Sequence, residues 1–248
     1  MLSKTEGIIL SNREYGETHK IVTILTKEHG KLSAICRGAN KVNSRLNVVT
    51  QPFLKGNYLI YLSKGLSTVQ QGEVVDSYRY LREDIIKTAY AAYIIELTDK
   101  LLLEKESDLY VFSELSNTLK RMNEEENDVI PVTMYELKMF QKGGFGPIIN
   151  HCVLCQQTER LCAFSIKEGG ILCENCVHND EYAYRISVKL IQLLQIFINT
   201  PIANIGKISV QKDNERLLRR LMDEYYESYG GFHLKSKRFL SQLHLFEE

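Results

Sequence analysis

Four of the six cysteines form two pairs with the spacing of a metal site. Two residues separate Cys152 from Cys155 and Cys173 from Cys176, and seventeen residues lie between the pairs. Each C-x2-C turn directs two thiolates at one point, and two such turns on a short hairpin complete a tetrahedral shell of four sulfurs. The pattern predicts one structural Zn²⁺ ion, held by these four cysteines, with no open coordination position for catalysis.

Other cysteine chemistry fits this pattern less well. A disulfide framework needs an oxidising compartment, and nothing in the sequence indicates secretion. A thioredoxin-type site has a single C-x2-C at the start of a helix, not two facing pairs. His151 and His178 adjoin the pairs and remain alternative ligands. Cys162 is expected to be a spare thiol in the intervening loop, and Cys36 a small buried hydrophobic side chain.

Basic residues are concentrated in one part of the N-terminal third. Residues 27–64 contain seven Lys or Arg and one acid, although the whole chain is neutral, with 31 basic and 31 acidic residues. A local basic surface on a neutral protein indicates a polyanionic partner for one face. The alternative is a solvated loop whose lysines serve solubility.

Motifs of the common enzyme classes are missing. Gly30-Lys31 and Gly206-Lys207 lack the surroundings of a P-loop, and the glycines of 143–146 lack the spacing of a dinucleotide site. The sequence contains neither G-x-S-x-G nor H-E-x-x-H, and no histidine begins the H-x-E pattern of zinc deaminases. These absences predict a protein that is not an enzyme.

The elements that position these residues change character near residue 80. Up to that point, short runs rich in Ile, Val, Leu and Tyr alternate with glycine-containing turns. Roughly five strands in so short a segment fit a small closed barrel of the OB type better than a sandwich. The predicted strands are 5–10, 19–26, 31–37, 58–62 and 69–75.

The remainder of the chain has helical periodicity. One long helix is predicted to start at 82–84, a second after a cap at Ser107-Asp108, and a third at Pro131, ending in the glycine-rich stretch 143–147. The predicted fold class is α+β: an OB-fold β-barrel over 1–80, then a helical domain over 81–248 interrupted by a four-cysteine zinc finger at about 148–180.

No membrane segment is predicted. The longest unbroken apolar run is 90–95, far short of the ~20 residues of a spanning helix. The first residues also lack the apolar region and cleavage site of a signal peptide. A cytoplasmic location is therefore expected.

Taken together, the order and spacing of these pieces resemble the bacterial RecO family of DNA repair proteins. The resemblance covers essentially the whole chain. One departure is that Phe145-Gly146 stands where an aromatic residue directly before Pro147 would be expected, which alters a turn. The segments that carry the resemblance are 6–10, 15–17, 20–26, 30–32, 37–39, 143–147 with Cys152 and Cys155, 164–165, 169–173 and 234–240.

The resemblance implies an activity and a set of partners. It implies binding of single- and double-stranded DNA, annealing of complementary strands, and work with RecR to load recombinase on gapped DNA. In some lineages the C-terminal tail of single-strand-binding protein is a further partner. A cytoplasmic, nucleoid-associated location follows. Two alternatives stay open: an adaptor that acts mainly through protein contacts, and a metal-dependent nucleic-acid enzyme with an unrecognised site.

Candidate DNA contacts follow from the positions of the cations, which would hold phosphates without reading sequence. The segment 37–45 is expected to be a mobile loop, and a second group at helical spacing could extend the groove or form a solvated helix face. Phe53, Tyr58 and Tyr61 could stack on bases or lie in the core. The candidate cations are Lys31, Arg37, Lys41, Arg45 and Lys55 near the barrel and Arg216, Arg219 and Arg220 in the second group.

Overall fold

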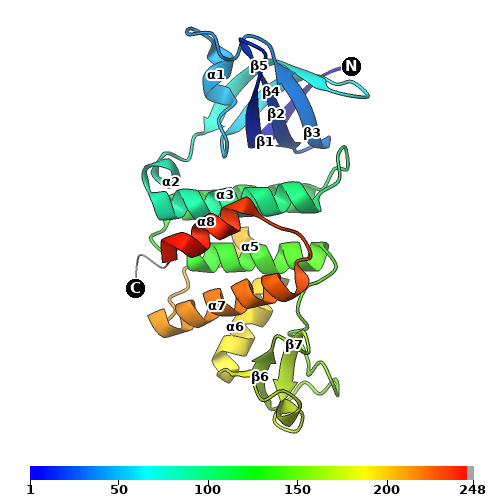
Figure 1. The fold of residues 1–248 in the computed structure, drawn as a ribbon, viewed down its shortest axis with the longest axis vertical. Helices are drawn as coiled ribbons and strands as arrows, with labels where there is room; N and C mark the ends of the chain where they lie inside the picture. The colour runs from blue at the N-terminus through cyan, green and yellow to red at the C-terminus, as the bar shows by residue number, and fades with distance from the viewer. Residues whose placement is uncertain (245–248) are drawn as a thin grey trace. The chain divides into compact units, whose positions relative to one another are not determined.

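The computed structural model describes residues 1–244. By its internal packing the chain forms two compact units, whose elements are shown in Figure 1. The first consists of Met1–Glu126 with the C-terminal segment that begins at Leu234, and the second of Asn127–His233. The barrel and the helices next to it in sequence therefore form one unit, and the cysteine pairs lie in the other.

The first unit begins with a closed five-stranded barrel, which confirms the predicted OB-type fold. The strand order is β1-β2-β3-β5-β4, and β4 pairs back onto β1. The β3–β5 pair is parallel and the others are antiparallel. The strands are β1 (Leu2–Tyr15), β2 (His19–Thr26), β3 (Gly30–Cys36), β4 (Lys55–Tyr61) and β5 (Ser67–Asp76), and the short helix α1 (Arg45–Val49) follows β3.

The barrel interior is filled by apolar side chains around one tyrosine. Tyr58 is fully buried and its hydroxyl donates to the carbonyl oxygen of Val49 at 2.7 Å. At Gly72 a Cβ atom would lie 2.8 Å from Val49, so only glycine allows this approach. Cys36 is also fully buried, as expected, and burial raises the pKa of its thiol to about 12.

Two of the three candidate stacking aromatics therefore belong to the core. Tyr58 fills the barrel, and Phe53 is buried beneath the Arg82 guanidinium, which lies 5.6 Å from its ring centroid. Neither ring is available to a base in this structure. Tyr61 is 52% exposed, so its ring is accessible for stacking on a base.

The long helix predicted to start at 82–84 is present, and a short helix that was not predicted precedes it. Asp84 ends the short helix and caps the long one by accepting from the backbone N–H groups of Ile86 and Lys87. Asp108 caps the following helix, as predicted, by accepting from Val111. These helices are α2 (Arg79–Glu83), α3 (Ile85–Leu101) and α4 (Leu109–Glu124), with α8 (Lys235–His244) packed on α3.

The second unit places a small sheet between helices. Strands β6 and β7 form a hairpin, and β8 pairs with the other edge of β6. The sheet follows α5 and precedes α6, so the finger interrupts a helical region as predicted. The elements are α5 (Val129–Lys142), β6 (Leu161–Ser165), β7 (Gly170–Cys173), η1 (Val177–Asn179), β8 (Tyr184–Arg185), α6 (Val188–Asn199), η2 (Ile202–Asn204) and α7 (Lys212–Tyr229). Over the described part of the chain, every helix is too short or too polar to span a bilayer.

Candidate metal centre and nucleic-acid interface

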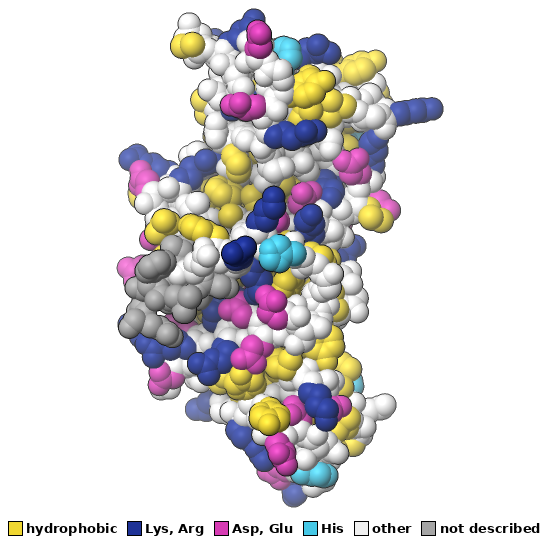
Figure 2. Space-filling model, in the orientation of Figure 1, with side chains coloured by type: hydrophobic (Ala, Val, Ile, Leu, Met, Phe, Trp, Pro, Cys, Tyr) yellow, Lys and Arg dark blue, Asp and Glu magenta, His cyan; other side chains and the backbone are white. Residues whose placement is uncertain are grey.

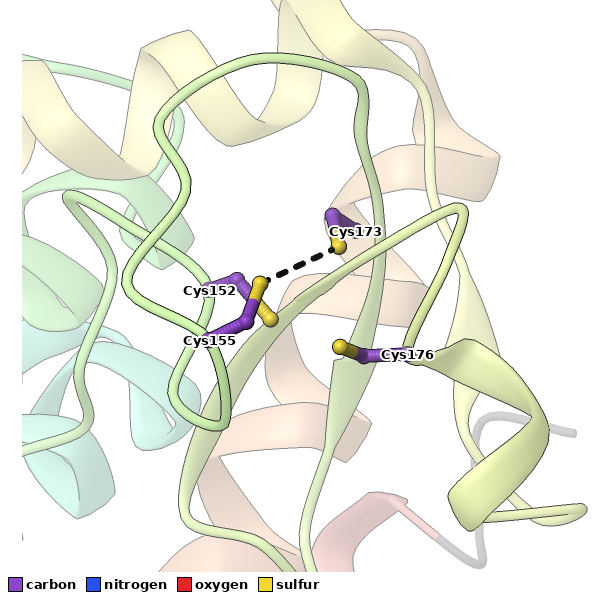
Figure 3. A group of neighbouring side chains, drawn as sticks. All are labelled: Cys152, Cys155, Cys173 and Cys176. Atoms are coloured by element: carbon purple, nitrogen blue, oxygen red, sulfur yellow. Dashed lines mark hydrogen bonds between the residues drawn. The ribbon is translucent and has the colours of Figure 1, made fainter.

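The four paired cysteines converge on one point beside the β6–β7 hairpin (Figure 3). Their sulfur atoms all lie within 4.8 Å of one another, and the sulfurs of Cys155 and Cys173 are 3.6 Å apart. Cys152 and Cys173 are fully buried, Cys176 is half-buried and Cys155 is exposed. The group therefore sits at the edge of the unit, with its inner half closed by protein.

Backbone hydrogen bonds fix the first cysteine pair against the strand that carries the second. Val153 donates to the carbonyl oxygen of Ile171 on β7 at 2.9 Å, and Ile171 donates to Ile148 at 2.8 Å. Within each pair the chain turns tightly: Gln156 donates to Cys152 at 2.8 Å, and Cys176 donates to Cys173 at 3.0 Å. The two turns are thus held face to face by the hairpin and do not depend on sulfur contacts alone.

The spacing of the sulfurs suits a metal ion and excludes a disulfide between Cys155 and Cys173. A tetrahedron with metal–sulfur bonds of about 2.3 Å has edges of about 3.8 Å, whereas a disulfide bond is only about 2.05 Å long. The 3.6 Å between the two sulfurs is close to the tetrahedral edge. Among the residues that the structure describes, the group consists of the four cysteines, without His151 or His178.

The pKa values of the clustered thiols also favour a metal site. Desolvation raises the pKa of Cys152, but backbone N–H groups directed at its sulfur outweigh it and lower the pKa to about 6. The pKa of Cys176 is raised to about 12, first by its contact with the Cys155 sulfur and then by desolvation. The Cys152 thiolate therefore forms readily, whereas Cys176 resists ionisation without a cation. Four clustered cysteines of this kind could hold a metal ion.

Cys162 stays outside the metal group, as the sequence predicted. It is half-buried on β6, and its sulfur accepts a hydrogen bond from the Arg185 guanidinium at 3.4 Å. Desolvation raises the pKa of this thiol. Cys162 therefore offers a matched control for substitutions of the clustered cysteines.

In the first unit, the segment 37–45 carries its three cations outward. Arg37, Lys41 and Arg45 are exposed, and no carboxylate among the described residues lies within ion-pair distance of any of them. The segment, expected to be mobile, is tied to the barrel: Gly38 donates to the His19 ring at 2.9 Å and Asn40 to the Thr18 carbonyl at 2.9 Å. Segment 37–45 is therefore a turn fixed by hydrogen bonds, and its positive charges face solvent.

Two further candidate DNA contacts, not predicted from the sequence, lie on the hairpin to which segment 37–45 is hydrogen-bonded. Arg13 and Tyr15 are exposed near the end of β1, just before the turn that contains Thr18. The predicted strand stops at Leu10, so Tyr15 falls in the predicted turn with Gly16 and Arg13 has no predicted element. Figure 2 shows Lys and Arg side chains distributed over the drawn face of the barrel, with hydrophobic side chains among them.

Lys31 and Lys55 do not join this basic surface. The Lys31 ammonium lies 3.0 Å from the Asp99 carboxylate and its side chain is only 12% exposed. Lys55 and Lys27 both lie 3.6 Å from Glu6. Lys31 is at the start of β3, whereas segment 37–45 follows the end of that strand. In this structure Lys31 links the barrel to α3, so the predicted DNA contact at Lys31 would require its release from Asp99.

The second predicted group of cations is split by the structure. Arg216 and Arg220 are exposed on α7, but Arg219 is 5% exposed. Its guanidinium donates to both oxygens of Glu136 at 2.8 and 2.5 Å and to Asp223 at 3.1 Å. A bidentate pair therefore holds the Arg219 charge inside the second unit in this structure, and the predicted DNA contact at Arg219 finds no exposed guanidinium there.

Removing the buried partner of this pair should destabilise the second unit strongly. Glu136→Gln leaves the Arg219 charge poorly compensated in a buried site, and we expect a loss of about 3 kcal/mol in unfolding free energy. Asp223→Asn removes the more exposed carboxylate of the same group and should cost about 1 kcal/mol or less. Urea titration followed by far-UV circular dichroism measures both; equal losses in the two variants would contradict the assignment.

Comparison with known families covers nearly the whole chain. The family model described as Recombination protein O N terminal matches residues 1–78, and that described as Recombination protein O C terminal matches residues 82–238. The chain is 48% identical over 246 residues to the DNA repair protein RecO of Oceanobacillus iheyensis, which is 99% of this chain and 95% of that protein. It is 42% identical over 243 residues to the DNA repair protein RecO of Bacillus subtilis, with 98% and 95% covered. The chain therefore belongs to the RecO family of DNA repair proteins.

Proposed function

We propose that this protein is a mediator of DNA repair and recombination that binds single- and double-stranded DNA and anneals complementary strands. The observation that carries the proposal is the anchored turn 37–45, whose three exposed cations lack acidic partners among the described residues. The family membership and the OB-type barrel support the same function. Binding and annealing DNA require no catalytic group, so we propose that the protein acts without being an enzyme.

Annealing places a particular demand on the binding surface. Any two complementary strands must be accepted, so the protein should hold phosphates and leave base edges free to pair. Arg37, Lys41 and Arg45 meet this demand as cations on a fixed turn, with Arg13 on the adjoining hairpin. The exposed ring of Tyr15 could stack on a base without selecting its identity.

The four clustered cysteines would hold one Zn²⁺ ion in this proposal. The ion supplies no step of DNA chemistry; it would bind the four thiolates, remove their mutual repulsion and stabilise the finger. Cys152 and Cys173 would anchor it from the buried side, and Cys155 and Cys176 would close it toward solvent. A full shell of four protein ligands leaves no place for a substrate.

The proposal also includes protein partners. We propose that the protein works with RecR to load recombinase on gapped DNA, and that the C-terminal tail of single-strand-binding protein is a further partner. This work takes place on chromosomal DNA, in the cytoplasm at the nucleoid. The competing function is an adaptor whose protein contacts do the work while DNA binding is incidental.

Strand annealing separates the two functions. Complementary oligonucleotides coated with single-strand-binding protein should anneal at least about tenfold faster with the protein present at low salt, and the gain should fade at high salt because counterion release drives phosphate binding. Fluorescence quenching between labelled strands measures the rate. No acceleration, with DNA binding intact, would favour the adaptor, and RecR binding would then be measured directly.

A further inference from the structure

An acidic segment of the helical region lies against the barrel strand where an OB-fold would receive DNA. Residues 102–108, named here the acidic strap, connect α3 to α4 and can be followed in Figure 1 beside β3. Glu104 forms a parallel β-bridge with Lys31, and Lys105 donates to the Lys31 carbonyl oxygen at 2.9 Å. The strap thus adds a short piece of strand to the start of β3.

Further contacts hold the strap across this end of the barrel. The Ser33 hydroxyl donates to the Glu104 carboxylate at 2.7 Å, and the Ser107 hydroxyl donates to the Lys27 carbonyl oxygen at 3.1 Å. The Lys105 ammonium donates to the carbonyl oxygen of Lys64, in the β4–β5 turn. The strap therefore reaches from the β2–β3 turn to the β4–β5 turn.

The approach at Gly30 shows how closely the strap lies on β3. Gly30 has a φ of +67°, and a Cβ atom there would lie 2.2 Å from the carbonyl oxygen of Glu106. Any side chain at this position would push the strap away. Glycine is the residue that permits both the turn and the contact.

The charge of the strap opposes phosphate at this place. OB-folds bind nucleic acid across the β2–β3 face and the neighbouring β1–β2 and β4–β5 loops. Glu104 and Glu106 are exposed on the strap, and nearby Asp99 neutralises Lys31. The end of the β3 surface that would otherwise offer a lysine to DNA is thus covered and made acidic, while Arg37 and Lys41 lie beyond the other end.

The attachment of the strap is polar. Leu102 is buried at its start, but residues 103–107 are all exposed, including Leu103 at 65%. Segments with few buried apolar contacts open at a small cost in free energy. The hydrogen bonds that hold the strap can be exchanged for bonds to water, so an incoming strand could displace the strap without unfolding the barrel.

We propose that the acidic strap is a displaceable cover over the β3 end of the DNA site. Single-stranded DNA first engages the turn 37–45 and then extends along β3, releasing residues 103–107 and freeing Lys31 from Asp99. Only strands long enough to reach the strap must displace it, so the cost of displacement falls on long strands and not on short ones. This inference rests on the proposed binding of DNA by the barrel.

Hydrogen–deuterium exchange of the full-length protein, with and without oligothymidylate, tests the displacement. Amide exchange within residues 103–107 should rise several-fold when DNA binds, while exchange in 37–45 falls. Protection of 37–45 with unchanged or slower exchange in the strap would overturn this inference alone. Absence of DNA binding would overturn the proposed function and this inference with it.

Two variants, each with two glutamates replaced by neutral glutamine, give an independent test. Glu104→Gln/Glu106→Gln keeps side-chain size and should bind a long oligothymidylate about fivefold more tightly at low salt, because two charges opposing phosphate are gone. Glu124→Gln/Glu126→Gln removes the same charge from exposed positions at and just beyond the far end of α4. Equal gains in the two variants would show a general charge effect and overturn the proposal.

Discussion

Replacing Cys173 with serine is expected to empty the metal site and to destabilise the second unit. Cys173 is fully buried at the end of β7, with its sulfur 3.6 Å from that of Cys155, so its loss opens the inner half of the shell. Metal affinity is coupled to folding, and a loss of about 3 kcal/mol would lower the melting temperature by roughly 10 °C in a chain of this size. Atomic emission measures metal per chain, expected to fall from one zinc ion to nearly none.

The matched control is Cys162→Ser. Cys162 lies on the neighbouring strand β6 and is half-buried, but it is outside the cluster. This variant should keep its metal and melt within about 3 °C of the unsubstituted protein, as a single hydrogen bond to sulfur contributes little. Full zinc content in both Cys173→Ser and Cys152→Ser would contradict the four-sulfur site.

The cysteine group could be predicted from sequence because its geometry is local. Two residues between cysteines fix a turn, and a hairpin of seventeen intervening residues brings the two turns together. The structure places the same four sulfurs within 4.8 Å of one another. What the sequence could not supply is the closing bond from Val153 to Ile171, since that contact depends on how the loop folds back.

The barrel was predictable in kind but not in detail. Five short β-type runs indicated it, whereas its closure depends on a parallel contact of β3 with β5 that periodicity does not encode. The length of β1 was also missed. The register between β1 and β2 shifts between Ile9 and Ser11, so the alternation breaks there although the strand continues to Tyr15. The exposed Arg13 was missed for this reason.

The cations show where reasoning from composition fails. Lys31 and Arg219 have the same charge as Arg37 and Lys41, yet both are occupied by carboxylates distant in sequence. Asp99 lies 68 residues after Lys31, and Glu136 lies 83 residues before Arg219. A run of basic residues therefore predicts a charged surface only for those cations that no carboxylate pairs with in the folded protein. In segment 37–45 all three cations remain exposed.

Reversing these three cations is expected to have the largest effect on DNA binding. Arg37→Glu/Lys41→Glu/Arg45→Glu should weaken binding of a single-stranded oligonucleotide about 100-fold at low salt and reduce the slope of log K against log salt by about two, since each phosphate contact contributes about 0.7. Fluorescence anisotropy over a salt series measures both. The side chains are exposed and the turn is held by backbone bonds, so the barrel should fold normally.

The control for this variant carries the same change in net charge at other positions. Arg79, Lys120 and Lys189 are exposed and lie outside the barrel. Their simultaneous change to glutamate alters the net charge equally but removes no predicted phosphate contact, so the affinity should fall only a few-fold and the salt slope should be kept. If the variant at 37, 41 and 45 binds as tightly as the unsubstituted protein at low salt, the turn is not the DNA site. A shared large loss would instead show that the overall field, and not this turn, attracts the strand.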